Sequence, residues 1–377
     1  MKPTKRILSI LLAVLLVLTA VVPSFAAGDA FAEEAYTNIV TFSDCQNVGP
    51  VAYRNFGQVL QVMHDDGLPE PDALLVGGDY SLILGDHAAA GIVQLQQHYL
   101  DVYPDGDPND ILTAQGNHDL PIAAFYPTGM YDMGTYCFYL INEDDYQWLQ
   151  GFRPGGEARI KQTAAKIKTA LDAMIAAGDN RPVIFITHVP LHYTSRTLYR
   201  DNCYAAHVFN VINEAAKTLD IIFLFAHNHS DDYDDYIGGS VNFMAPGDTV
   251  LIPMTDKHGK GCYTEETLNF TYTNCGYIGY TKNNVTDTST NVLTMGAIRF
   301  FADRFELLKY TKDGLFRAYT VERRHTATAE EMQQTPTTDA LVRKNEKIWH
   351  FEQRILQPML RVFIKIFDTF GLKIFEK

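Results

Sequence analysis

The sequence predicts an α/β protein whose first half forms βαβ units around a largely parallel sheet. From Thr37 onward, short apolar and β-branched runs alternate with helix-length segments, which is the pattern of such units. Beyond Asp231 the runs become alternating strands separated by turn residues, which predicts a mostly antiparallel second half. A hydrophobic content of 46%, with 12% aromatic residues, is ample for a buried core.

Each expected strand of the first half runs into a loop of polar residues. These strands cover residues 38–43, 73–77, 111–115, 183–187 and 221–226. Helices with apolar residues three and four apart are expected over residues 51–64, 158–177 and 204–219. In the second half, strands are expected over residues 241–245, 291–301, 304–310 and 315–321. The Asp313-Gly314 pair predicts a hairpin between the last two of these strands.

The sequence pattern at the two ends of the chain differs from that of its centre. We expect one domain over residues 35–325, a polar linker over 326–340 and a helical tail over 341–377. Residues 1–26 have the features of a secretory signal peptide, because three basic residues precede an apolar run and small residues follow it. A transmembrane anchor is the alternative, but the run is shorter than the roughly 20 apolar residues that a spanning helix needs. We therefore expect a secreted or cell-surface protein without a lipid anchor.

Charge and cysteine content narrow the class of protein. The formal net charge is −14, whereas a groove for polymeric nucleic acid needs a basic surface, so nucleic acid is not an expected partner. Five cysteines are too few and too irregular for a disulfide scaffold, and their odd number leaves at least one unpaired within the monomer. A bridge between Cys262 and Cys275 stays an open alternative. The acidic run over residues 231–235 lacks the glycine and distal glutamate of a calcium loop, so we expect a solvated loop.

Polar residues that can bind metals follow each of the five expected strands in the first half. A lone histidine, or a lone aspartate after a strand, is usually structural. Their order is more informative, because ligands in open α/β sheets bind outside the carboxyl ends of the strands. The residues are Asp44, Gln46, Asp79, Asn117, His118, Asp119, His188, His227 and His229. Cys45, between two of them, is expected to point away from the site and pack, because alternate residues of a strand face opposite sides.

This order resembles the pattern of the calcineurin-like metallophosphoesterase superfamily, which is D-x-H, G-D, G-N-H-D/E, H and G-H-x-H. The resemblance covers residues 38–321 and implies a four-layer α-β-β-α sandwich of two mixed sheets flanked by helices. Gln46 stands where the family has a histidine, and Ala226 where it has a glycine. Because an amide oxygen is a weaker donor than imidazole to late transition metals, we expect the ion next to Gln46 to be held less tightly.

The resemblance also assigns two metal positions. The first is surrounded by Asp44, Gln46, Asp79 and His229. The second is surrounded by Asp79 as a bridge, Asn117, His188 and His227. Ligands of these types suit Mn, Fe, Zn or Ni, and the sequence does not select among them.

The activity implied by the resemblance is hydrolysis of phosphate mono- or diesters. A hydroxide that bridges the two metals would attack phosphorus, His118 would protonate the leaving oxygen as general acid, and Asp119 would orient His118. His192 is either a substrate contact or a surface or core histidine. The sequence does not select among monoesters, diesters, nucleotides, phosphoproteins and phospholipid head groups as substrate.

Two other functions stay open. A non-catalytic or weakly catalytic binding protein on the same fold is indicated by Gln46, since one imidazole ligand is missing. A surface-interaction protein is indicated by the tail, where an amphipathic helix is expected over residues 358–370. That helix either docks onto the protein's own core or makes a peripheral contact with a membrane. No feature of the sequence indicates an oligomeric state.

Overall fold

A computed structural model gives the fold of most of the expected domain. The residues that it describes are 37–45, 51–80, 87–108, 111–119, 126–142, 145, 156–191, 204–227, 242–255, 261–279 and 293–334. The expected signal peptide, Gln46, His192, His229, the acidic run over 231–235 and the helical tail lie outside these residues, so the expectations for them stay predictions. Among the described helices, none is long and apolar enough to cross a membrane.

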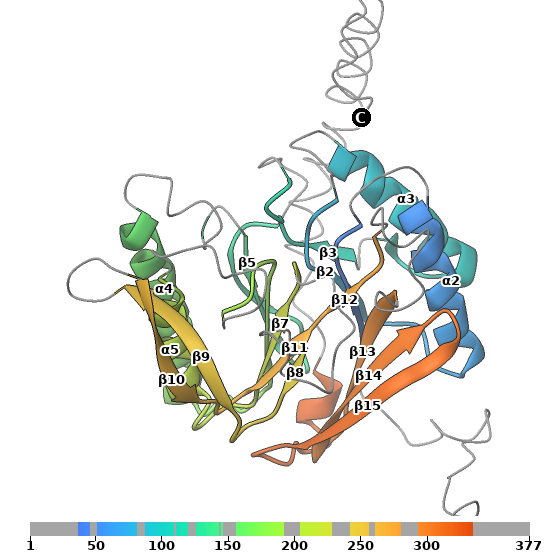
Figure 1. The fold of residues 1–377 in the computed structure, drawn as a ribbon. Helices are drawn as coiled ribbons and strands as arrows, with labels where there is room; N and C mark the ends of the chain where they lie inside the picture. The colour runs from blue at the N-terminus through green and yellow to red at the C-terminus, as the bar shows by residue number, and fades with distance from the viewer. Residues whose placement is uncertain are drawn as a thin grey trace, which may run out of the picture.

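The first sheet joins strands from both halves of the chain (Figure 1). Its spatial order is β15-β14-β13-β1-β2-β3, and β12 pairs with β13. The strands are β1 (Thr37–Phe42), β2 (Ala73–Val76), β3 (Ile111–Thr113), β12 (Gly276–Tyr277), β13 (Thr294–Phe300), β14 (Arg304–Thr311) and β15 (Gly314–Glu322). Strands β1 to β3 are parallel, whereas β13 pairs antiparallel with β1 and with β14. The sheet is therefore mixed, and its parallel part comes from the predicted βαβ units.

The second sheet is also mixed, in the order β4-β5-β6-β7-β11-β8. Its strands are β4 (Gly129–Asp132), β5 (Cys137–Ile141), β6 (Val183–Thr187), β7 (Ile221–Phe225), β8 (Phe243–Met244) and β11 (Thr271–Asn274). Strands β5, β6, β7 and β11 run parallel, and β4 and β8 are antiparallel at the two edges. A separate hairpin of β9 (Thr249–Thr255) and β10 (Gly261–Thr267) packs beside the helix α5 (Ala205–Ala215).

Helices cover the outer face of each sheet, as Figure 1 shows. They are α2 (Val51–Asp65), α3 (His87–Val102), α4 (Gly156–Ala177) and α5 (Ala205–Ala215). Apolar side chains spaced by three or four residues, such as Phe56 and Leu60 of α2, pack against the first sheet. Ile167 and Leu171 of α4 do the same against the second sheet. Each helix thus buries one apolar face.

The inner faces of the two sheets pack against each other and form the central layer of the core. Ile298 and Leu307 of the first sheet belong to the same buried cluster as Ile184 and Leu224 of the second sheet. With the two helical layers outside, this arrangement confirms the predicted four-layer α-β-β-α sandwich. It also directs the carboxyl ends of the parallel strands of both sheets to one end of the molecule.

Several elements differ from the sequence predictions. The strands β4 and β5, the helix α3 and the hairpin of β9 and β10 were not predicted, and β11 is a parallel strand in a half expected to be mostly antiparallel. The predicted linker includes a short 3₁₀ helix at Glu331–Gln333. Cys262 and Cys275 are both free thiols, so the bridge left open between them does not form. Cys45 is buried in the helical side of the core, as expected.

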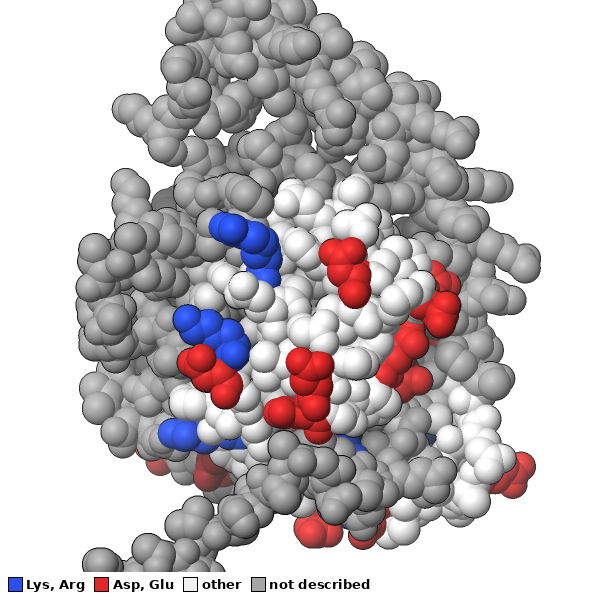
Figure 2. Space-filling view, turned by 90° about the vertical axis from the view of Figure 1, so that its right-hand side faces the viewer, with Lys and Arg blue, Asp and Glu red and all other residues white. Residues whose placement is uncertain are grey.

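The surface that carries α2 and α3 is in keeping with the acidity of the chain. Figure 2 shows acidic side chains spread over the described part of this face, with a few basic side chains toward its left side. No continuous basic stripe is visible among the described residues of this view. The expectation that polymeric nucleic acid is not a partner stays a prediction.

Candidate metal centre

Five of the parallel strands end at the predicted site residues. Asp44 follows β1, Asp79 follows β2, Asn117 follows β3, and the histidines 188 and 227 follow β6 and β7. Because both sheets direct these strand ends to the same end of the sandwich, five segments far apart in the sequence meet there. The convergence expected from the order of the residues is therefore present in the fold.

Two carboxylates and two imidazoles form the buried centre of this site. His188 Nε2 lies 3.2 Å from Asp79 Oδ2 and 3.9 Å from Asp44 Oδ1. His227 Nδ1 lies 3.3 Å from the same Nε2 atom. One donor atom each from Asp79, His188 and His227 lie within 4.8 Å of one another. Nitrogen and carboxylate oxygen atoms grouped this closely match the ligand types of transition-metal sites.

The tautomer of His188 follows from its contact on the other side of the ring. Its Nδ1 lies 2.8 Å from the carbonyl oxygen of Gly77, which can only accept a hydrogen bond. Nδ1 therefore carries a proton, and Nε2 is the ring nitrogen that faces Asp79 and Asp44, where a metal would take the place of any proton it carries. A backbone carbonyl that orients a histidine in this way is a common support for a metal ligand.

Three of the candidate ligands have an unusual backbone conformation. Among the described residues, the non-glycine residues with positive φ are Asp44 at 53°, Asp79 at 58° and His227 at 66°. This left-handed region costs free energy for most residues and is enriched at functional sites. Hydrogen bonds hold the strained segments, because Asp44 N donates to Gly78 O at 2.9 Å and His227 N donates to Asp44 Oδ2 at 3.1 Å.

Asn117, at the same site, has a buried side-chain oxygen, Oδ1, that lacks a hydrogen-bond partner among the described residues. A buried carbonyl oxygen without a partner is costly, whereas coordination to a cation would satisfy it. Asn117 therefore fits the predicted role of a metal ligand, and so does the set of Asp and His donors beside it.

Asp119 has a role that the sequence did not indicate. Its carboxylate accepts hydrogen bonds from the backbone N–H groups of Asp79 at 2.8 Å, Tyr80 at 3.0 Å and Gly116 at 2.9 Å. It thereby ties the loop after β3 to the loop that carries Asp79. Burial, followed by the charge of Asp79, raises the pKa of Asp119 to about 7, although the Gly116 hydrogen bond opposes this. The expectation that Asp119 orients His118 stays a prediction.

His118 lies at the opening of the site, where its side chain is 38% exposed. Its backbone N–H donates to Asp79 Oδ1 at 2.9 Å, and its ring Nε2 lies 3.9 Å from Asp79 Oδ2. Burial acts to raise the pKa of Asp79, but the charge and the hydrogen bond of His188 outweigh it, so that this pKa is lowered. Asp79 is thus the carboxylate around which the other groups are arranged.

Glycines allow the loops of the site to approach each other. A side chain on Gly77 would place its Cβ 2.8 Å from Cys275 Sγ and 3.1 Å from Cβ of both Ala226 and Ser43. Gly78 has a φ of 97°, and a Cβ there would lie 2.7 Å from the Cα of Gly116. Both positions therefore require glycine for steric reasons. The sequence signal for them was the Gly-Gly pair directly before Asp79.

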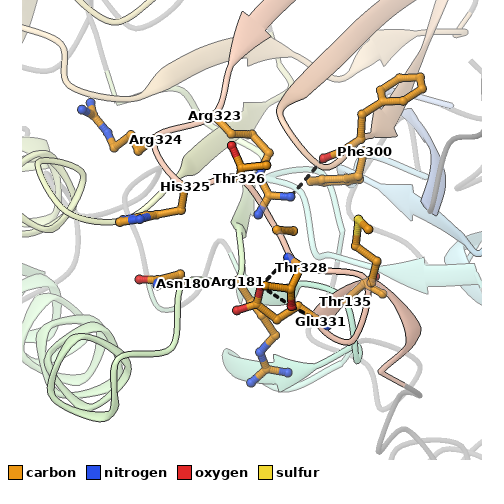
Figure 3. Close-up of a pocket in the computed structure, with 13 residues that line it drawn as sticks. Thr135, Asn180, Arg181, Phe300, Arg323, Arg324, His325, Thr326, Thr328 and Glu331 are labelled. Carbon is orange, nitrogen blue, oxygen red and sulfur yellow. Dashed lines mark hydrogen bonds between the residues drawn. The ribbon is translucent and has the colours of Figure 1, made fainter.

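A cavity of about 340 Å³ lies away from the metal centre, near the amino end of β6 (Figure 3). Three arginines line it, and nearby carboxylates compensate the charge of two of them. Arg181 forms ion pairs of 2.7 Å with both Asp132 and Asp179, and Arg323 Nε lies 3.5 Å from Asp220 Oδ2. Because ligand sites of α/β sheets lie at the carboxyl ends of the strands, we assign the chemistry to the metal centre.

A comparison with family models agrees with the sequence resemblance. The chain matches the family model described as calcineurin-like phosphoesterase over residues 37–231. A comparison with curated proteins gave no significant match. Similar solved structures include a dimetal phosphatase from Danio rerio, with 10% identity and a TM-score of 0.41 over 77% of this chain and 100% of that one.

Two further solved structures show similar values. An uncharacterised protein from Streptococcus pneumoniae, predicted to be a phosphoesterase, has 12% identity and a TM-score of 0.33 over 76% of this chain and 98% of that one. The GAP50 anchor of the inner membrane complex of Plasmodium has 11% identity and a TM-score of 0.44, covering 83% and 94%. These values are low, so the assignment depends on the family match, which spans more than half of the chain. This protein belongs to the calcineurin-like phosphoesterase family.

Proposed function

We propose that this protein is an exported, metal-dependent phosphoesterase that hydrolyses phosphate mono- or diesters. The observation that carries the proposal is the convergence of Asp79, His188 and His227, whose donor atoms lie within 4.8 Å of one another. The unpartnered carbonyl oxygen of Asn117 at the same site supports it. Membership of a phosphoesterase family points to the same reaction.

The residues at this centre would hold two metal ions, which we infer to be drawn from Mn, Fe, Zn and Ni. Within the described residues, the ligands are Asp44, Asp79, Asn117, His188 and His227. Gln46 and His229, which follow from the family pattern, complete the proposed set. When bound, two such ions supply an activated water and neutralise the charge on a phosphoryl group.

The side chains around the ligands have separate roles in this proposal. His118, exposed at the opening, donates a proton to the leaving oxygen of the ester. Asp119 holds the backbone of Asp79 in place, which fixes the position of the shared carboxylate. His192 is the proposed contact to the substrate. Secretion through the signal peptide of residues 1–26 gives the enzyme access to phosphoesters outside the cytoplasm.

The alternative is a non-catalytic or weakly catalytic binding protein on the same fold. The observation that favours it is Gln46, which replaces an imidazole ligand with a weaker amide donor. In that case the protein would hold one ion, or bind phosphoesters without turnover. The third possible function is that of a surface-interaction protein. In that case the tail of residues 341–377 would make the contact and the sandwich would serve as a scaffold.

One experiment separates the phosphoesterase from the other two functions. The purified protein is analysed for bound metal by elemental analysis and assayed with an aryl phosphate monoester and an aryl phosphate diester. A phosphoesterase is expected to bind two equivalents of metal and to hydrolyse at least one substrate. The Asp79→Asn variant should lose metal and activity together, because Asp79 would be shared by both ions. Full metal occupancy in that variant would refute the assignment, and two bound metals without turnover would favour the binding protein.

A further inference from the structure

The chain crosses from the second sheet to the first next to the loops that carry candidate metal ligands. Strand β11 ends at Asn274 in the second sheet, and β12 begins at Gly276 in the first. We call residues Asn274, Cys275 and Gly276 the crossing segment. The N–H of Cys275 donates to Phe225 O at 2.8 Å, at the end of the strand that leads to His227. The crossing segment thus contacts the loops that carry the ligands.

All three carbonyl groups of the crossing segment accept hydrogen bonds from buried side chains of the first sheet. Lys309 donates to Asn274 O, Thr41 Oγ1 donates to Cys275 O at 2.8 Å, and Ser43 Oγ lies 2.5 Å from Gly276 O. Carbonyls that leave a strand ladder must find other partners when they are buried. Here Lys309 of β14, Thr41 of β1 and Ser43, which directly follows β1, are among these partners.

Ser43 links the crossing segment to a candidate ligand. Its Oγ lies 2.5 Å from Gly276 O and also 2.5 Å from Asp44 Oδ2, and Ser43 is fully buried. Since a hydroxyl has a single proton, it donates to one of these oxygens at a time. The position of the hydroxyl relative to Gly276 therefore influences the orientation of the Asp44 carboxylate.

Lys309 reaches the crossing segment through space left by a glycine. Lys309 pairs with Gly296 in the register of β14 and β13, and Gly296 pairs with Thr41 of β1. A Cβ on Gly296 would lie 3.3 Å from Lys309 Nζ and would collide with Thr41 Oγ1. The lysine is only 2% exposed, which is rare for this residue type and costly for its charge. Its contact with Asn274 O connects it to the crossing segment, which also contacts Ser43.

We propose that Ser43 and Lys309 are positioning residues of the metal centre, which orient the Asp44 carboxylate through the crossing segment. Lys309 donates a hydrogen bond to Asn274 O and so fixes the crossing segment. Gly276 O of this segment contacts the Ser43 hydroxyl, which in turn contacts the carboxylate of Asp44. This inference rests on the proposed function, because it assigns a metal-binding role to Asp44. Partners of this kind typically change metal affinity by about 10- to 100-fold when they are removed.

The test is a titration of the metal-free full chain with Mn²⁺, followed by calorimetry, without any assay of activity. Ser43→Ala and Lys309→Met are expected to weaken the binding of one Mn²⁺ equivalent by roughly 10-fold or more. Ser43→Thr, which retains a hydroxyl, should restore most of the affinity. Thr37→Val and Arg299→Met are matched controls: the first removes a hydroxyl at the far end of β1, and the second removes a buried cation from β13, the strand between β1 and β14. The controls should bind Mn²⁺ like the natural chain.

A double variant tests whether Lys309 acts through Ser43. If it does, Lys309→Met should weaken Mn²⁺ binding much less in a Ser43→Ala background than in the natural chain. If Lys309→Met does not fold, Thr41→Val replaces it, because that change removes the adjacent hydrogen bond to the segment. Unchanged Mn²⁺ affinity in folded Ser43→Ala and Lys309→Met, or an equal loss in the controls, overturns the inference. If the natural chain binds none of Mn²⁺, Fe²⁺, Zn²⁺ and Ni²⁺, the proposed function itself is overturned.

Discussion

Replacement of the buried Lys309 by methionine should change how the stability of this protein depends on pH. Burial lowers the pKa of Lys309 to about 8 from an ordinary value of 10.5, and the neighbouring Cys275 opposes this only in part. The unfolded chain therefore binds this proton more tightly than the folded chain does. Between these two pKa values the unfolded state carries more protons, so stability rises with pH in this window.

The size of the effect follows from the difference between the two pKa values. One pKa unit corresponds to about 1.36 kcal/mol, so the full cost of holding the charged lysine in the core is roughly 3 kcal/mol. That cost is present below pH 8 and disappears as pH rises toward 10.5. Between pH 7 and pH 9.5, the natural chain should gain about 2 kcal/mol in free energy of unfolding from this group. Lys309→Met lacks the group and should lack this gain.

The assay is urea unfolding of both proteins at several pH values from 7 to 9.5, with a chelator present so that metal binding does not contribute. The measured quantity is the difference in free energy of unfolding between the natural chain and the variant. Loss of the hydrogen bond to Asn274 O shifts this difference by a constant amount of about 1 to 3 kcal/mol, but does not change its slope with pH. Lys312→Met, at an exposed position in the turn after β14, is the control for the loss of one cation.

Parallel profiles for the natural chain and Lys309→Met over this pH range would refute the reasoning. They would mean that Lys309 keeps an ordinary pKa and that its ammonium group reaches water. If the free energy of unfolding of Lys312→Met also fails to rise with pH, the effect comes from net charge and not from the burial of Lys309.

Three further changes test other parts of the protein. His118→Ala should retain metal and slow turnover by about 10² to 10⁴, with a smaller loss for substrates that have good leaving groups, and an equal loss for all leaving groups would remove His118 from the role of general acid. Gln46→His should tighten the binding of the second metal equivalent in a metal titration, whereas two equally tight sites in the natural chain would mean that Gln46 is not a ligand. Liposome flotation with and without residues 356–377 tests the amphipathic tail, and the absence of any difference would exclude membrane contact.

The parts of the fold that the sequence predicted are those that follow from local patterns. The strands β1, β2, β3, β6 and β7 and the helices α2, α4 and α5 have clear apolar periods, and their positions agree with the structure to within a few residues. The strand β5 lies in Cys137–Ile141, a short apolar run that resembles a buried helix segment as much as a strand. The parallel pairing of β11 with β7 depends on a contact between distant segments, which no local pattern contains.

In the candidate site, too, the sequence predicted some features and not others. The order of aspartate, asparagine and histidine residues at successive strand ends was enough to place Asp79, His188 and His227 together, because parallel strands direct their carboxyl ends to one edge. Their types and spacing also indicated the family. Neither the order of these residues nor their spacing indicates which other residues hydrogen-bond to the ligands and position them.

Only the tertiary structure decided how these ligands are held. The positive φ of Asp44, the backbone hydrogen bonds of Asp119 and the contact between His188 and Gly77 O arise where separate loops meet. The burial of Lys309 depends on Gly296 in the next strand, which leaves the space that its side chain needs. A sequence specifies which side chains can bind a metal, but distances, tautomers and burial depend on segments that become neighbours only when the chain folds.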